Sequence, residues 1–260
     1  MKTVKASVYA GLLMAGAGSF AHADENLWGY VSGAETLPQG ANEAYAELTS
    51  RNNKGIGTYD AYNLEIEYER GITSRLSGSV GLQGQAIDTK DIFINAYVPG
   101  SKDYGMKPSG VEGDLKFMFL SPAKDPVGLS GRLTVEHSWL DPHSGQDKDT
   151  TSVSTDFQVQ KYFLDDQLVA VANGGIEATY AKRDPIANLP PDFEWPTDPE
   201  MEIELTSGVG LSYRVAPGLF IGAETLHITE FETTVGQERE SWHAGPSIHY
   251  AQQRWWTTVT

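Results

Sequence analysis

Acidic side chains recur at every second position in several stretches of the chain. Glu65, Glu67 and Glu69 alternate with apolar residues, and the same spacing returns at Glu202 and Glu204. Successive side chains of a β-strand point to opposite faces, so each stretch would gather its carboxylates on one face. If that face lines a water-filled channel, its negative potential favours cations. The spacing therefore predicts an acid-rich inner surface of a β-structure.

The predicted lumen-lining set contains many acids and few opposing charges. A network of ion pairs that fills a narrow barrel and blocks flow explains the same set equally well, because the number of strands alone does not fix an open lumen. The residues assigned to the lumen are Glu47, Glu65, Glu67, Glu69, Arg75, Glu112, Asp114, Arg132, Glu136, Asp156, Glu177, Glu202, Glu204 and Arg214.

Two histidine–serine neighbours raise the alternative of a hydrolase. A nucleophilic serine needs an imidazole within hydrogen-bonding reach. His137 and Ser138 lie in a predicted strand, where adjacent side chains point to opposite faces, and His143 and Ser144 lie in a predicted loop. The sequence also has no Gly-x-Ser-x-Gly elbow. We therefore predict a protein that is not an enzyme and has no catalytic residues.

The sequence lacks the spacings that hold metals and cofactors. His243 and His249 share a face of one predicted strand but stand about 20 Å apart at the rise of a strand, too far to bind one metal ion. The acid-rich run 141–149 lacks the spacing of an EF-hand, so we expect a solvated loop there. We predict neither a metal site nor a cofactor.

The composition restricts the possible partners. The 260 residues carry 19 Lys and Arg against 35 Asp and Glu, for a formal net charge of -16, and there is no cysteine. The lack of cysteine excludes disulfides. The acidic balance opposes binding to phosphate backbones, so we predict no nucleic-acid partner.

The N-terminus has the features of an export signal. Lys2 and Lys5 precede an apolar run that ends at Gly18, and Ala21-His22-Ala23 forms a small-x-small cleavage site. A membrane anchor is the alternative, but the run is shorter than the roughly 20 apolar residues that span a bilayer. The predicted organisation is a cleaved signal peptide over residues 1–23, a lead-in segment over 24–42 and a β-barrel over 43–260.

Alternation with period two dominates the rest of the chain, in about eleven segments. A soluble β-sandwich shows the same alternation, with its apolar face inward. The connections favour a membrane barrel, because tight turns such as residues 70–74 and 216–218 alternate with long polar loops, as they do in outer-membrane barrels. The long loops occupy residues 51–58, 88–108, 140–150, 184–200 and 231–240.

These patterns predict an all-β fold, a transmembrane antiparallel up-and-down β-barrel of about 12 strands. Such a barrel must close with an even number of strands, because hydrocarbon tolerates no open strand edge. The chain stops at Thr260 partway through a strand, so either the segment from Leu27 to Ala34 supplies a strand or one is missing; we favour a C-terminal truncation. The proline-rich residues 183–199 either fold into the mouth as a constriction or cap the barrel.

Aromatic side chains gather near both ends of the predicted strands. Tyr and Trp prefer the headgroup region of a membrane, so we expect two aromatic belts, one at each interface. A general preference of aromatic residues for strands is the simpler alternative. The residues assigned to the belts are Tyr62, Tyr68, Phe119, Trp139, Phe163, Tyr180, Tyr213, Trp242, Tyr250 and Trp255.

Three stretches carry a likeness to a known family: ETLPQG at 35–40, YERGITSRL at 68–76 and YRVAPGLFIG at 213–222. They resemble an uncharacterised proteobacterial outer-membrane β-barrel family of unknown function, itself similar to barrels associated with the phenol meta-cleavage pathway. The resemblance implies a transport-type barrel, and it brings no agreed substrate and no catalytic residues. Such barrels end on an aromatic strand that is recognised during assembly, whereas this chain ends on Thr260.

Taken together, the sequence predicts a passive, porin-like channel in the cell outer membrane, exported by a cleaved signal peptide. Its expected partners are outer-membrane lipid and lipopolysaccharide, the barrel-assembly machinery and small solutes, with cations favoured by the acidic lumen. Two other classes stay open. One is a barrel hydrolase acting on envelope lipids, and the other is a structural or adhesive barrel without transport.

Overall fold

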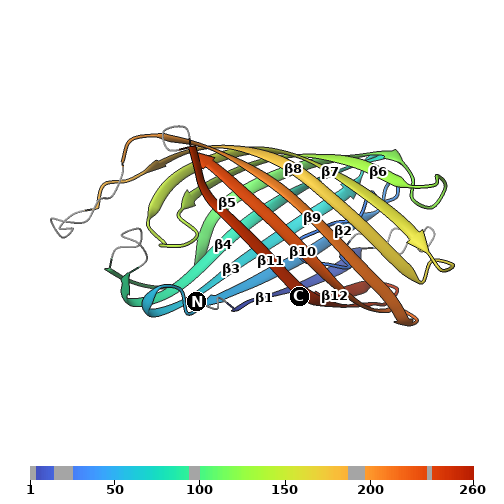
Figure 1. Ribbon diagram of the computed structural model, residues 1–260, viewed down its shortest axis with the longest axis horizontal. Helices are drawn as coiled ribbons and strands as arrows, with labels where there is room; N and C mark the ends of the chain where they lie inside the picture. The colour runs from blue at the N-terminus through green and yellow to red at the C-terminus, as the bar shows by residue number, and fades with distance from the viewer. Residues whose placement is uncertain (1–3, 15–25, 94–99, 187–196, 233–235) are drawn as a thin grey trace.

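Twelve antiparallel strands form one closed barrel in the computed structural model, which describes residues 4–14, 26–93, 100–186, 197–232 and 236–260 (Figure 1). Each strand from β2 onward pairs with the next along the chain, and β1 closes the ring between β12 and β2. The strands are β1 (Val4–Met14), β2 (Asn42–Asn52), β3 (Ile56–Gly71), β4 (Leu76–Phe93), β5 (Gly100–Leu120), β6 (Gly128–Leu140), β7 (Asp147–Phe163), β8 (Leu168–Arg183), β9 (Glu200–Ala216), β10 (Leu219–Glu232), β11 (Gly236–Ala251) and β12 (Trp255–Val259).

The strands are apolar on the outside of the barrel and polar on the inside, the reverse of a soluble protein. In β3, Ile66 and Tyr68 are exposed on the outer face, whereas Glu67 and Glu69 are buried on the inner one. This arrangement confirms the predicted all-β barrel and excludes a sandwich with an apolar core. Further exposed residues of the outer face are Val80, Leu82, Val111, Leu115, Leu133, Val135, Val153, Val159, Val209 and Leu211.

The twelfth strand comes from an unexpected part of the chain. The segment from Leu27 to Ala34, considered above as a source of that strand, has no strand structure and lies inside the barrel, so that interpretation was wrong. Its apolar residues do not alternate with period two, and it therefore cannot present one apolar face to the outside. Instead β1, which falls within the predicted signal peptide 1–23, pairs with β2 along its length and with β12 over residues 8–12.

From β2 onward, the longest connection, between β8 and β9, lies at one end of the barrel, and the shortest turn, between β9 and β10, lies at the other (Figure 1). We call these two ends the short-turn end, where β3 joins β4 and β9 joins β10, and the long-loop end, where β6 joins β7. The predicted long loops 51–58, 88–108 and 231–240 were wrong in extent, because the flanking strands continue into them and leave only residues 53–55, 94–99 and 233–235 between strands. Part of the proline-rich connection, residues 187–196, lies outside the described residues, so its role as constriction or cap stays a prediction. The described residues include no helix long and apolar enough to cross a membrane.

Two small apolar clusters are buried inside the barrel, and polar side chains line the space between them. The lumen is therefore no uniform water-filled tube. The cluster at the short-turn end comprises Leu27, Trp28, Val31, Val169, Val171 and Phe220. The cluster at the long-loop end comprises Tyr59, Ala61, Ile87 and Ile92, with Tyr104 packed against it.

Candidate functional site: an acidic lumen with two filling segments

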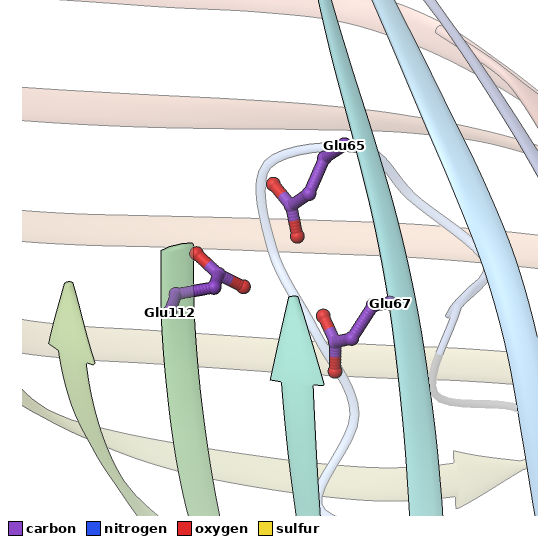
Figure 2. Close-up of side chains that lie close together, drawn as sticks. All are labelled: Glu65, Glu67 and Glu112. Atoms are coloured by element: carbon purple, nitrogen blue, oxygen red, sulfur yellow. The ribbon is translucent and has the colours of Figure 1, made fainter. Parts of the chain in front are cut away.

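Three carboxylates meet on the inner wall of the barrel. Glu65 and Glu67 lie on β3 and Glu112 lies on β5, and all three point toward one another (Figure 2). The strand between them, β4, has Gly81 beside Glu67 and Glu112, and a Cβ there would lie only 2.6 Å from Cγ of Glu112. The missing side chain lets Glu112 reach across β4.

The geometry of these three carboxylates suits a cation. One oxygen from each of Glu65, Glu67 and Glu112 lies within 4.8 Å of the others, and this is the one such group of acids or histidines among the described residues. Carboxylate oxygens are the ligands that hard cations such as Ca²⁺ prefer. These residues could therefore hold or pass a cation.

Three adjoining cavities run through the lumen. The first, of about 300 Å³, lies between residues 26–32 and the inner wall of β2 to β6. The second, of about 280 Å³, shares Tyr30, Glu47 and Glu65 with the first. The third, of about 570 Å³, shares Glu136 and Pro142 with the second. The shared residues place the three cavities in one row.

Carboxylates clearly outnumber cations around these cavities. Some cations are neutralised locally: Nζ of Lys148 lies 3.5 Å from a carboxylate oxygen of Glu200, and Arg239 forms an ion pair with Glu230. The lining acids are Glu47, Glu65, Glu67, Glu69, Glu112, Asp114, Glu136, Asp141, Glu177, Glu202, Glu204, Glu230 and Glu238, and the lining cations are Arg51, Lys54, Lys116, Arg132, Lys148 and Arg239.

Residues 26–38, which we call the lumen segment, occupy the short-turn half of the barrel without pairing as a strand. A buried backbone N–H must still find an acceptor. One buried carboxylate, that of Glu224 on β10, accepts the N–H groups of Gly29, Tyr30 and Val31 at 2.9, 2.6 and 3.1 Å. Glu224 thus supplies the acceptors that a neighbouring strand supplies elsewhere.

Side-chain amides continue this arrangement along the lumen segment. Asn173 on β8 accepts the N–H of Ser32 at 2.7 Å and donates to its carbonyl at 2.9 Å. Gln160 on β7 accepts the N–H of Ala34 at 2.6 Å. From the opposite wall, Nζ of Lys116 donates to the carbonyl of Gly33 at 2.9 Å. Single side chains of the inner wall therefore form the hydrogen bonds of the segment's backbone N–H and C=O groups.

The inner wall also fits the lumen segment in shape. A Cβ at Gly208 would lie 2.6 Å from the side chain of Val31, and a Cβ at Gly210 would lie 2.7 Å from Val31 and 2.8 Å from the ring of Trp28. The indole Nε1 of Trp28 donates to the carbonyl of Leu211 at 3.3 Å. With Val31 and Trp28 in place, a side chain at either glycine would push the segment away from β9.

The β6–β7 loop, residues 141–146, folds into the long-loop end of the barrel. Arg51 on β2 donates to the carbonyl of Pro142, and Gln85 on β4 donates to the carbonyls of Asp141 and Pro142 at 3.3 and 2.9 Å. Asp141 is buried. The expectation of a solvated loop over 141–149 was wrong for these residues, because the inner wall supplies the donors that water would otherwise provide.

His143 in this loop is held neutral. Burial lowers the pKa of His143 well below its usual 6.5, and the positive charges of Lys54 and Arg51 lower it further. Its Nδ1 faces Nη1 of Arg51 at 3.0 Å. Among the described residues no hydrogen bond joins His143 to Ser144, whose hydroxyl accepts the N–H of Gln146 at 3.2 Å. This geometry does not activate a serine nucleophile.

Most of the residues assigned to the lumen lie where the alternation put them. All except Arg75, Asp156 and Arg214 line the three cavities. Asp156 and Arg214 share the inner faces of β7 and β9 with buried polar side chains two residues away. Arg75 is placed differently: it is exposed in the turn between β3 and β4, where no strand holds its side chain on the inner face.

The residues assigned to the aromatic belts form two groups on the outside of the barrel. Trp139 and Tyr250 are half-buried: the indole of Trp139 donates to the carbonyl of Pro108 at 2.9 Å, and Tyr250 contacts the ring of Trp255. The belt residues near the short-turn end are Tyr68, Phe119, Phe163, Tyr213, Tyr250 and Trp255, and those nearer the long-loop end are Tyr62, Trp139, Tyr180 and Trp242.

Sequence reasoning missed the residues that hold the two filling segments. Glu224 is the one acid in the apolar stretch 219–228, and that isolation is a signal that could have singled it out. Arg51, Gln85 and Asn173 carry no comparable signal, since they look like ordinary polar residues of an inner face.

A closed antiparallel barrel with an apolar exterior and a polar interior defines an outer-membrane-type β-barrel. Within this class, the chain belongs to the Family of unknown function (DUF6662), whose sequence profile matches residues 20–260. This result confirms the expected membership of a family of unknown function. No curated protein matches the sequence significantly.

The chain is similar to several solved structures at low sequence identity. A loop L8 deletion mutant of OmpT, an outer membrane protein of Vibrio cholerae, is 9% identical over 84% of this chain and 62% of that chain, with a TM-score of 0.36. The FpvAI–pyocin S2 complex is 13% identical over 95% and 39%, with a TM-score of 0.27. The unliganded ferric citrate transporter FecA is 9% identical over 96% and 42%, with a TM-score of 0.24. The chain spans less than two thirds of each, and likeness at this level carries no argument about function.

Proposed function

We propose that this chain is an outer-membrane channel for small cationic solutes. The observation that carries the proposal is the row of adjoining cavities in which acids outnumber Lys and Arg by thirteen to six. The apolar exterior supports a place in the outer membrane. The predicted export signal over 1–23 agrees with this place, although its cleavage would remove β1 from the ring. Outer-membrane lipid and lipopolysaccharide and the barrel-assembly machinery are its proposed partners.

Cation preference follows from the charge and shape of the lumen. An enclosed cavity with low-dielectric walls focuses the field of its carboxylates, so it concentrates cations and repels anions. The group formed by Glu65, Glu67 and Glu112 offers oxygen ligands that replace part of a cation's hydration shell. Further acids such as Glu177 and Glu204 line the third cavity, where they provide further binding positions along the path of the cation.

We also propose that the barrel has no enzymatic role. The contact of His143 with Arg51 rather than with Ser144 supports this view over a hydrolase that acts on envelope lipids. A structural or adhesive barrel remains the second alternative, and it has no need of an acidic interior. The resemblance to barrels associated with the phenol meta-cleavage pathway supports transport but names no solute.

Planar-bilayer recordings with reversal potentials in a salt gradient test the proposal. We expect a cation-selective current from the folded full-length chain. Replacing Glu65→Gln together with Glu204→Gln should lower the cation/anion permeability ratio, because both residues line the cavities. Glu240→Gln, an exposed acid that contacts His227 at 3.0 Å, is the matched control and should leave the ratio unchanged. Anion selectivity, or a permeability ratio that the double substitution leaves unchanged, would refute the proposed cation-selective lumen.

A further inference from the structure

The lumen segment stands in the way of a solute that crosses the barrel. We propose that this segment, residues 26–38, is an autoinhibitory plug that the carboxylate of Glu224 latches inside the lumen and that leaves through the short-turn end when the latch is broken. Its effect on conduction rests on the proposed channel function, whereas its movement does not.

Both ends of the segment lie at the short-turn end. The carbonyl of Asn26 accepts the hydroxyl of Thr258 on β12 at 2.5 Å, and just beyond the segment the N–H of Gly40 donates to the carbonyl of Gly71 at 2.8 Å. The segment is therefore a loop that enters and leaves at the same mouth. It can swing out without threading any part of the chain through the barrel.

The segment is held mainly on one side, with Lys116 on β5 and Arg132 on β6 donating hydrogen bonds to it from the other. Its apolar residues and most of its hydrogen bonds meet β7 to β10, whereas its other side faces the 300 Å³ cavity against β2 to β6. In Figure 2 it runs past Glu65, Glu67 and Glu112 as a pale loop. Its backbone bonds go mainly to side chains rather than to a strand ladder, so it can detach without opening the barrel.

Among the described residues, Glu224 is the side chain that makes the most hydrogen bonds to the backbone of the segment. Hydrogen bonds to an ionised carboxylate are about twice as strong as neutral ones, and here three backbone donors share one carboxylate. Removing it leaves three N–H groups without this acceptor in the docked state, that of Val31 buried and those of Gly29 and Tyr30 partly buried, while water can serve all three once the segment is outside. The docked state should therefore lose occupancy by more than tenfold.

Thiol labelling measures the movement directly, because the natural chain has no cysteine. Ala34 is fully buried, so a single Ala34→Cys variant, reconstituted in vesicles, should react slowly with a membrane-impermeant maleimide. Adding Glu224→Ala should raise the labelling rate at least tenfold, with Glu224→Gln intermediate and Glu240→Ala without effect. Heat-modifiable gel mobility reports that each variant is folded. Equal rates with and without Glu224 would overturn the latch.

A disulfide lock tests the consequence for conduction. A Cβ at Gly208 would lie 2.6 Å from Cγ1 of Val31, so Val31→Cys with Gly208→Cys has its Cβ atoms near the spacing of a disulfide. In the Glu224→Ala background, where the segment is released, the oxidised barrel should conduct at least tenfold less than the same barrel after reduction. Equal currents would overturn autoinhibition but leave the channel standing. Fast labelling of a Glu224→Ala barrel that carries no current would instead remove the channel function and leave the movement standing.

Discussion

Leu82 offers a direct test of the medium that surrounds the barrel. It lies on the outer face of β4, 63% exposed, and pairs with Ile66 and Val111, which are also exposed. Leu82→Arg would place a guanidinium among acyl chains. Arginine on the lipid face of a barrel costs about 2–4 kcal/mol near the bilayer midplane. At about 1.4 kcal/mol per factor of ten, the folding equilibrium should fall by roughly 30- to 700-fold.

Gln83→Arg is the matched control, because it sits at nearly the same depth on the opposite face. The amide of Gln83 donates to a carboxylate oxygen of Glu112 at 3.3 Å, so an arginine there gains an acidic partner. We expect it to change stability by no more than about 1 kcal/mol. Urea unfolding in lipid vesicles, followed by tryptophan fluorescence, measures both variants. If the two lose equal stability, or if Leu82→Arg is harmless, the apolar face does not meet lipid.

Three further predictions concern the interior. Because the pKa of His143 is lowered in the folded state, its contribution to stability is present above pH 6.5 and is lost as pH falls below that value. The protection factors of amides in the β6–β7 loop, corrected for the intrinsic pH dependence of exchange, should therefore fall below pH 6.5, and a His143→Gln variant that keeps this dependence would contradict the assignment. Gly210→Leu should displace the lumen segment, because the new side chain would overlap Val31 and Trp28, and it should therefore speed maleimide labelling of Ala34→Cys in a folded barrel. Labelling as slow as in the Ala34→Cys variant alone would contradict the close packing of the segment against β9. Arg183→Met, which removes a buried partner of Glu200 at 2.5 Å, should cost about 3–5 kcal/mol of unfolding free energy in urea, whereas the exposed Lys182→Met should cost little.

Much of the barrel could be predicted from local pattern. The alternation of Glu65 and Glu67 with Ile66 and Tyr68 assigns each side chain to a face, because a strand has a period of two whatever it pairs with. The alternation of tight and long connections then orients the strands. Arg75 marks the limit of this reasoning, since the pattern loses its meaning where a strand gives way to a turn.

The contents of the lumen could not be predicted in the same way. The lumen segment and the β6–β7 loop have no regular period, and their positions depend on partners far away in the chain, such as Glu224 for Val31 and Arg51 for Pro142. Hydrogen bonds to single side chains leave no repeating signal in either partner. The same holds for β1, whose place between β2 and β12 is set by the gap that the other strands leave.

The sequence by itself determined the two faces of the wall, the acidity of the inner one and the direction in which the chain runs back and forth, because these properties repeat with the geometry of the strand. Only the tertiary structure decided what fills the barrel. The closed barrel brings residues nearly two hundred positions apart, such as Gly29 and Glu224, within hydrogen-bonding distance. This contact can form only after the ring of strands has closed.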